Sequence, residues 1–217
     1  MPLYVFALVD RVPRDGAGAG IGGPVTFRKV AGAFAAVERR ADVPPIEFGL
    51  LRKHQTVVSR LAARVPAILP VRFGTLVSPV ELHELLDERD DELAEAFAYV
   101  RHRVQFTWRT RTKRRPVGPG PGAALIQSGT EYLRRAARSA NPPVPAMFRP
   151  VRAQLRPLIA GEKYEPAAGT RGARLYHLVE ARAAAEYAKR ASHIQDARRT
   201  LAVSGPWPPF AFAPEAL

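Results

Sequence analysis

The sequence contains no cysteine, which excludes disulfides, thiolate metal sites and cysteine nucleophiles. Aromatic residues are also scarce, at 8% of 217 residues, while alanine supplies much of the 47% hydrophobic share. We therefore expect a helix-rich core with few aromatic rings. No apolar run approaches the roughly 18 residues of a membrane-spanning helix. Residues 1–9 are apolar but lack a basic start and a small-residue cleavage site, so we expect a soluble, cytoplasmic protein.

The formal net charge is +13, and two adjacent blocks of opposite charge stand out from it. Residues 78–99 carry eight acidic residues and one arginine, whereas residues 101–115 carry seven basic residues and no acid. The basic residues of this block are Arg101, Arg103, Arg109, Arg111, Lys113, Arg114 and Arg115. We expect the acidic block to neutralise part of the basic one.

Hydrophobic periodicity predicts an α+β protein, and 217 residues fit either one large domain or two small domains of mixed sheet plus helices. In the first half we expect strands at 3–9, 25–30, 33–38 and 68–73, and helices at 50–65 and 79–100, the latter capped by Ser78. In the second half we expect strands at 104–108, 174–181 and 200–204, helices at 129–139, 147–159 and 182–199, a linker at 109–122 and a loop at 162–173. The predicted domains are residues 1–99 and residues 100–217, and no internal sequence repeat is visible.

The sequence contains partial matches to several catalytic and cofactor motifs, but none of these motifs is complete. Residues 18–23 match G-x-G-x-x-G, but strand-forming residues follow instead of a helix, which favours a flexible loop over a nucleotide site. His83 and Glu84 begin like the zinc motif H-E-x-x-H, but Asp87 replaces the second histidine. No serine stands in a G-x-S-x-G turn. We therefore expect no cofactor and no metal, and an enzyme of unrecognised type is only a third reading.

Two interpretations of the basic block at residues 101–115 remain open. Its cations alternate with Phe106 and Trp108, a combination that could neutralise phosphates and stack on bases. The alternative is an edge strand whose cations prevent edge-to-edge pairing. No nucleic-acid fold motif accompanies the block, so we expect no specific nucleic acid as a partner. Arg109, Arg111, Lys113, Arg114 and Arg115 remain a candidate partner surface.

Four segments, in order, resemble the gas vesicle protein F/L family. They are the opening strand at 3–9, the helix with His54 followed by Ile68-Leu-Pro-Val-Arg72-Phe73-Gly74-Thr75, the segment Leu175-Tyr-His-Leu-Val-Glu180, and Ser204-Gly205-Pro206-Trp207-Pro208-Pro209-Phe210-Ala-Phe212. The second is similar to the family's LP-x-RFGT segment, and the last to its GPWPPYSF ending. The sequence departs from the family in its arginine content and in Gln105, where the family tends to have an acid.

This resemblance implies two α+β domains related to the ferredoxin-like fold. It also implies a non-catalytic accessory or minor structural protein of gas vesicle assembly, whose partners are the shell protein and other vesicle proteins. A basic nucleic-acid-binding module using residues 101–115 is the alternative. We further expect the tail to pack on its own chain between the domains with Trp207 buried, rather than remain free for a partner.

Overall fold

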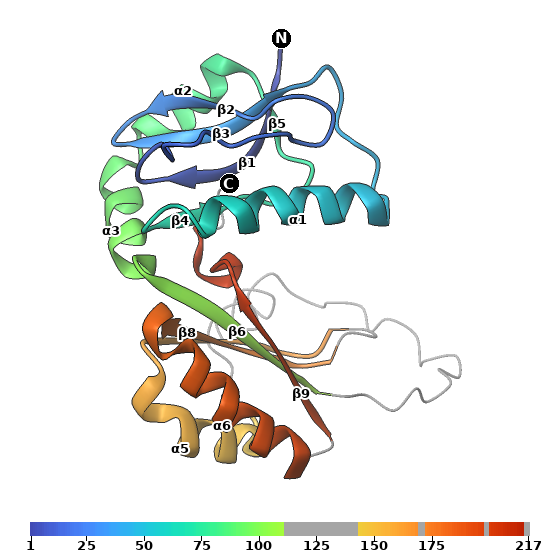
Figure 1. The fold of residues 1–217 in the computed structure, drawn as a ribbon, viewed down its shortest axis with the longest axis vertical. Helices are drawn as coiled ribbons and strands as arrows, with labels where there is room; N and C mark the ends of the chain where they lie inside the picture. Colours follow the sequence, from blue (N-terminus) through green and yellow to red (C-terminus); the bar gives the residue numbers. More distant parts are fainter. Residues whose placement is uncertain (111–142, 169–171, 198–199, 215–217) are drawn as a thin grey trace, which may run out of the picture.

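The structure is a computed structural model that describes residues 1–110, 143–168, 172–197 and 200–214. It contains two β-sheets that lie one after the other along the long axis of the molecule, and helices pack on each sheet (Figure 1). All strand pairs in both sheets are antiparallel. The α+β prediction is confirmed. No helix in the described residues is long and apolar enough to cross a membrane.

The first sheet is built around β1 (Leu3–Val9), whose seven residues are all buried. The other strands are β2 (Thr26–Val30), β3 (Ala33–Arg39), β4 (Ile68–Pro70) and β5 (Leu76–Val77), in the order β2-β3-β1-β4, with β5 also paired to β1. Because helices cover both faces of the sheet, β1 is a continuous apolar run rather than an alternating one. The predicted strand at 68–73 is shorter, since residues 71–75 turn towards β5.

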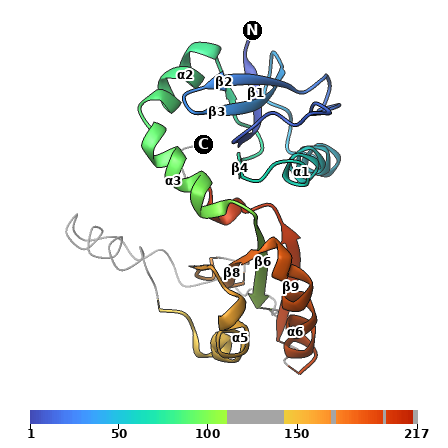
Figure 2. The ribbon, with the colours of Figure 1, turned by 60° about the vertical axis from the view of Figure 1, so that its left-hand side comes forward.

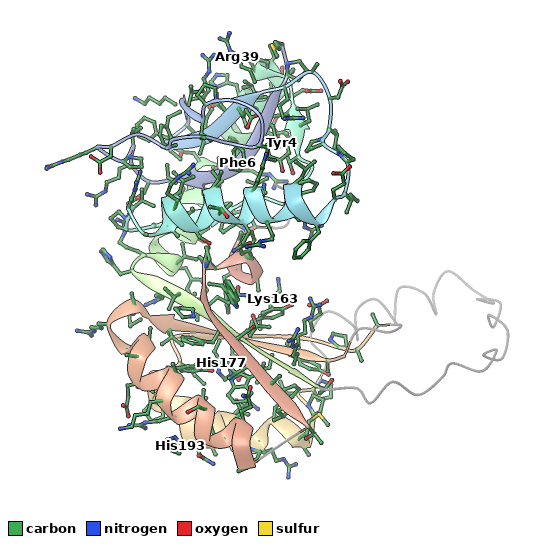
Figure 3. The ribbon with its side chains drawn as sticks, turned by 45° about the vertical axis from the view of Figure 1, so that its right-hand side comes forward. Tyr4, Phe6, Arg39, Lys163, His177 and His193 are labelled. Carbon is green, nitrogen blue, oxygen red and sulfur yellow. The ribbon has the colours of Figure 1, made fainter. Side chains whose placement is uncertain are left out.

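Helices cover the two faces of the first sheet from opposite sides (Figures 1 and 2). Helix α1 (Phe48–Ala62) packs on the face that carries Tyr4 and Phe6, which point towards it in Figure 3. Helices α2 (Pro79–Asp87) and α3 (Asp90–Val100) pack on the face that carries Leu3 and Val5. Successive side chains of a strand point to opposite faces, so β1 supplies both cores.

The single acidic helix expected at 79–100 is wrong, because the chain forms two helices with a break at Glu88 and Arg89. The start is as expected, since Ser78 and Glu81 form a capping box with Pro79 in the first turn. Asp90, Asp91 and Glu92 occupy the first turn of α3, where negative charge stabilises a helix N-terminus. Asp90 Oδ1 also accepts a hydrogen bond from Gly32 N–H at 3.0 Å, which holds the second helix to the β2–β3 turn.

The second sheet has the order β7-β8-β6-β9. Its strands are β6 (Arg103–Thr110), β7 (Gly161–Glu165), β8 (Arg174–Glu180) and β9 (Leu201–Trp207). Helices α5 (Arg149–Leu155) and α6 (Ala184–Ala197), flanked by 3₁₀ turns at 146–148, 156–158 and 181–183, share one core with β6 and β8. The loop expected at 162–173 is wrong for residues 162–165, which pair with β8 as an edge strand.

The two sheets share one strand order: in each, the first and third strands are central and the fourth pairs with the first. The sequence shows no repeat, so the likeness is one of topology. The first sheet has no helix between β1 and β2, and the ferredoxin-like description stays a prediction. The boundary proposed after residue 99 falls in the last turn of α3, which leads into β6 (Figure 2). The helix expected at 129–139 and most of the linker expected at 109–122 lie outside the described residues.

Candidate functional site

The segment Arg72–Thr75 forms the turn between β4 and β5 and is fixed from inside the first core. Tyr4 O–H donates to His54 Nδ1 at 2.8 Å, and His54 Nε2–H donates to the Val71 carbonyl at 3.1 Å. The Tyr4 oxygen in turn accepts from Gly74 N–H at 3.3 Å. This chain of hydrogen bonds assigns the His54 proton to Nε2 and ties the turn to β1 and α1.

Burial sets the protonation of this chain. His54 is 4% exposed, and desolvation lowers its pKa to about 4, so the ring is neutral near pH 7. Desolvation likewise raises the pKa of Tyr4 to about 12. Both groups therefore serve as neutral donors and acceptors that position the turn.

The tail motif begins inside β9, which extends three residues beyond the predicted strand end, through Gly205, Pro206 and Trp207. Gly205 has φ +135°, and a Cβ there would lie 2.8 Å from the Gln105 carbonyl oxygen. A glycine is thus required at this close approach. The Gln105 side chain is buried and accepts a hydrogen bond from Ala211 N–H at 2.7 Å, which joins β6 to the tail.

The expectation that Trp207 is buried is wrong, since this side chain is 40% exposed. Leu201 and Val203 of β9 pack on the second core, and strict alternation would bring Trp207 to the same face. A bulge intervenes, because Thr107 pairs with Ser204 whereas Gln105 pairs with Trp207. The extra residue in β9 reverses the alternation and turns the indole outwards.

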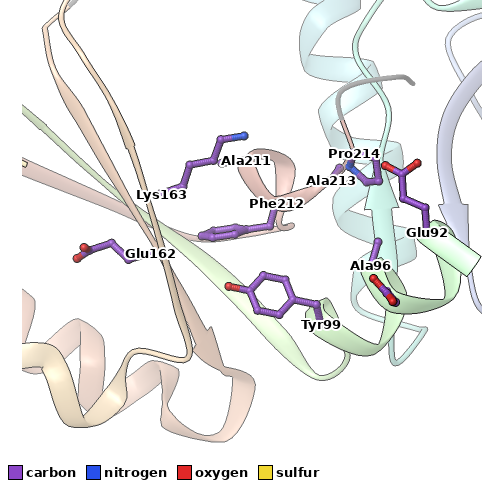
Figure 4. Close-up of a pocket in the computed structure, with 10 residues that line it drawn as sticks. Glu92, Ala96, Tyr99, Glu162, Lys163, Ala211, Phe212, Ala213 and Pro214 are labelled. Atoms are coloured by element: carbon purple, nitrogen blue, oxygen red, sulfur yellow. The ribbon is translucent and has the colours of Figure 1, made fainter. Parts of the chain in front are cut away.

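The rest of the tail packs on its own chain, as expected. Pro208 and Pro209 are buried. Phe210 packs against the core on the α1 side of the first sheet, and Phe212 packs against the core on the α3 side. In Figure 4 the Phe212 ring lies beside Tyr99 of α3, with the ring centroids 6.1 Å apart. The tail therefore lies between the two sheets and contributes to both cores of the first.

The two motifs, at residues 72–75 and 205–210, meet in an open groove of about 490 Å³ beside the first half of α1. We call it the α1 groove, and it is lined by Phe48, Leu51, Arg52, His54, Gln55, Arg72, Phe73 and Phe210. Phe48 is 76% exposed and Leu51 is 38% exposed, so two large apolar side chains of α1 face solvent. Leu51 falls inside the helix predicted at 50–65, whereas Phe48 falls outside it and gave no signal.

Two arginines form the charged part of the α1 groove. The guanidinium carbon of Arg52 lies 5.8 Å from the centroid of the Phe48 ring. Arg72 is exposed, and within the described residues neither arginine has an acidic partner. An apolar floor with unpaired cations is suited to binding another protein rather than to chemical catalysis.

The glycine loop has no free anion site at its centre. Ile21 N–H and Gly22 N–H donate to the two carboxylate oxygens of Glu38 at 2.7 and 2.9 Å. Glu38 is 2% exposed and also pairs with Arg40 at 3.2 Å. A side-chain carboxylate therefore occupies the amides that would face a phosphate, which removes the basis for a nucleotide site. Among the described residues, no cluster of three or more His, Asp or Glu side chains could hold a metal.

The basic block does not have the geometry for base stacking. Phe106 and Trp108 are 2% and 0% exposed, inside the second core, so the stacking part of the nucleic-acid hypothesis is wrong. Arg101 pairs with Asp10 at 2.7 Å and Arg103 with Glu180 at 2.9 Å. For these two cations, the expected neutralisation by the acidic block is also wrong. Arg109 is exposed in β6, and Arg111, Lys113, Arg114 and Arg115 lie outside the described residues.

A second buried polar chain crosses the other core and gave no signal in the sequence. Trp108 Nε1–H donates to the Tyr187 oxygen at 2.8 Å, and Tyr187 O–H donates to His177 Nδ1 at 2.6 Å. His177 Nε2–H then donates to Glu162 at 3.1 Å. Tyr187 and His177 are both fully buried, whereas Glu162 at the end of the chain of hydrogen bonds is half-buried. The role of this chain of hydrogen bonds is to hold β6, β7, β8 and α6 together.

Nearly the whole chain is similar to known proteins of one kind. Residues 2–214 match the family model described as gas vesicle synthesis protein GvpL/GvpF. The crystal structure of gas vesicle protein GvpF from Microcystis aeruginosa is similar, with a TM-score of 0.73 and 15% identity over 98% of this chain and 99% of that chain. GvpF from Anabaena sp. PCC7120 gives a TM-score of 0.72 and 15% identity, over 98% and 96% of the two chains. No curated protein matches the chain.

Proposed function

Because the chain belongs to the GvpL/GvpF family of gas vesicle synthesis proteins, we propose that it is a non-catalytic accessory protein of gas vesicle assembly. In this proposal it acts in the cytoplasm, at the gas vesicle, through contacts with shell or other vesicle proteins. The α1 groove is the contact surface. Membership of the family supports the gas vesicle role, and the exposed apolar groove supports the proposed mode of action.

One observation carries the choice of surface: two of the four segments that resemble the family, far apart in the sequence, line the same exposed apolar groove. Large apolar side chains such as Phe48 are unfavourable in water unless a partner covers them. The buried Tyr4–His54 chain holds one wall of the groove, and the Gln105–Ala211 hydrogen bond holds the tail that forms another. A preformed surface loses less entropy on binding than a flexible one.

The test is genetic complementation in a vesicle-forming host. Deleting the gene should abolish or severely deplete gas vesicles without changing growth in shaken culture, and the intact gene should restore them. A Phe48→Asp/Leu51→Asp gene should fail to restore them, because two carboxylates replace the apolar floor. Met147→Asp is the matched control, since Met147 is exposed at 44% and lies on the other half of the molecule.

Vesicles are counted by electron microscopy, and melting temperatures of the purified variants show that they are folded. A normal vesicle yield in the deletion strain contradicts the assembly role. A normal yield with Phe48→Asp/Leu51→Asp contradicts the choice of groove while leaving the assembly role intact.

A further inference from the structure

A second exposed apolar patch lies on α2, and its charge is opposite to that of the α1 groove. Leu85 is 43% exposed and stands beside the half-buried Leu76 and Val77 of β5. We call this the α2 patch; it surrounds a shallow pocket of about 370 Å³ lined by Leu76, Val77, Glu81, Glu84, Leu85 and Glu88. Residues 81, 84, 85 and 88 follow helical i, i+3, i+4 and i+7 spacing, so they form one stripe.

The acids of the α2 patch are not used inside the molecule. Within the described residues, Glu84 and Glu88 form no ion pair, and Glu81 is engaged only with the cap at Ser78. Arg101 and Arg103, which follow in the sequence, pair with Asp10 and Glu180 instead. In the part of the chain that the structure describes, the patch is thus an apolar centre whose negative rim is not neutralised by a neighbouring cation.

The two surfaces face away from each other. Helix α1 covers one face of the first sheet, and α2 covers the opposite face (Figures 1 and 2). A single molecule therefore cannot bring its α2 patch to its own α1 groove. The α2 patch of one molecule can reach the α1 groove of another. This contact leaves one free α1 groove and one free α2 patch at the two ends of the pair.

We infer that the occupant of the α1 groove is the α2 patch of a second copy of this chain. This inference rests on the proposed function and names a second copy of this accessory protein as the vesicle protein that the same groove contacts. Leu85 and its apolar neighbours lie on Phe48, Leu51 and Phe73, while Glu84 and Glu88 meet Arg52 and Arg72. A helix that lays an apolar stripe into a hydrophobic groove is a recurring recognition mode, and opposite charges at the rim set its orientation.

The second copy is favoured over a foreign protein because one contact covers both exposed apolar surfaces and pairs both sets of unused charges. The chain carries a net +13, so two copies repel each other at long range. The acidic α2 patch is a part of this basic molecule that is attracted to the arginines of the groove instead of repelled by them. The contact joins two different surfaces, so it is head-to-tail and builds short chains or closed rings rather than a symmetric dimer.

The experiment uses the purified full-length chain and two single variants. Phe48→Ser removes the apolar floor of the groove, and Leu85→Ser removes the centre of the patch. Serine is neutral, so the two altered surfaces cannot pair with each other through new charges. Met147→Ser is the matched control, with a side chain exposed to almost the same extent as Leu85.

Sedimentation equilibrium over a concentration series should show the wild type and Met147→Ser growing beyond a dimer. Each of the other two variants should weaken association by about tenfold or more, as expected for loss of about 1.4 kcal/mol or more. An equimolar mixture of the two variants retains one intact patch and one intact groove, so it should form a 1:1 pair and nothing larger.

Three results overturn the inference. One is a wild type that stays monomeric at every concentration; if Phe48→Asp/Leu51→Asp still abolishes vesicles in the host, the groove then binds another protein and the proposed function stands. The second is association that Leu85→Ser leaves unchanged, which places the contact elsewhere. The third is a mixture of the two variants that remains monomeric.

Discussion

Lowering the pH should weaken the fold through His54, and the size of the effect follows from its burial. Desolvation lowers the pKa of His54 to about 4 in the folded chain, from 6.5 in the unfolded chain. As the pH falls, the unfolded chain binds a proton at this histidine before the folded chain does. The contribution of neutral His54 to the free energy of unfolding is therefore complete above about pH 6.5 and is lost towards pH 4. Each pKa unit between the unfolded and the folded chain corresponds to about 1.4 kcal/mol. The free energy of unfolding should therefore fall by about 2 kcal/mol between pH 7 and pH 5 and by about 3 kcal/mol by pH 4.

The assay is urea denaturation at half-unit pH steps from 7 to 4.5, for the wild type and for His54→Gln. Glutamine does not titrate, so the variant should be less stable at pH 7 but should lose about 2 kcal/mol less than the wild type by pH 5. Because all other groups are common to both proteins, the difference between the two curves isolates His54. His83→Gln, a histidine on the exposed side of α2, is the matched control.

Parallel curves of unfolding free energy against pH for the wild type and His54→Gln refute the reasoning. A buried neutral histidine must make the wild-type curve steeper between pH 6.5 and pH 4 than the curve of the variant. A wild type that becomes more stable as the pH falls refutes its sign.

Three further changes test other parts of the fold by chemical denaturation. Tyr187→Phe should cost about 2–4 kcal/mol, because it leaves Trp108 Nε1–H and a His177 nitrogen buried without partners; a loss below about 0.5 kcal/mol contradicts the chain of hydrogen bonds. Gly205→Ala should cost about 2 kcal/mol or more, since the positive φ and the nearby carbonyl both oppose a Cβ, and an unchanged midpoint contradicts that geometry. Trp207→Ala should cost only about 1 kcal/mol and should move the emission maximum to shorter wavelength, because only the buried Trp108 then remains; a loss above about 3 kcal/mol contradicts the exposure of Trp207.

The strands and helices predicted correctly from the sequence are those specified by local patterns. The aromatic and β-branched run at 3–9 gave β1, and the Ser78–Glu81 box gave the start of α2. The edge strand β7 was missed because its sequence, GEKYE, has little apolar character and is held by pairing with β8. The break between α2 and α3 was missed because the apolar positions continue in register while the acids at 90–92 favour a new helix start.

The candidate site was predictable only in part, because it depends on contacts between distant segments. Both motifs were identified from the sequence, but no local pattern shows that Arg72, Phe73 and Phe210 line one groove. The exposure of Trp207 depends on a one-residue bulge against β6, which periodicity within β9 cannot reveal. The burial of Phe106 and Trp108 reversed the base-stacking hypothesis for the same reason: alternation gives the face of a strand but not which face is covered.

The position of the tail also sets the order in which the molecule can be completed during synthesis. The first sheet and its helices are encoded by residues 1–100, yet Phe210 and Phe212 pack against its two cores. At the usual rate of translation, the roughly 100 residues between α3 and the tail take about 5–20 s to leave the ribosome. Throughout that interval the N-terminal half lacks the Phe210 and Phe212 rings that pack against its two cores. The apolar surface that these rings cover is therefore open to chaperones until the tail is synthesised.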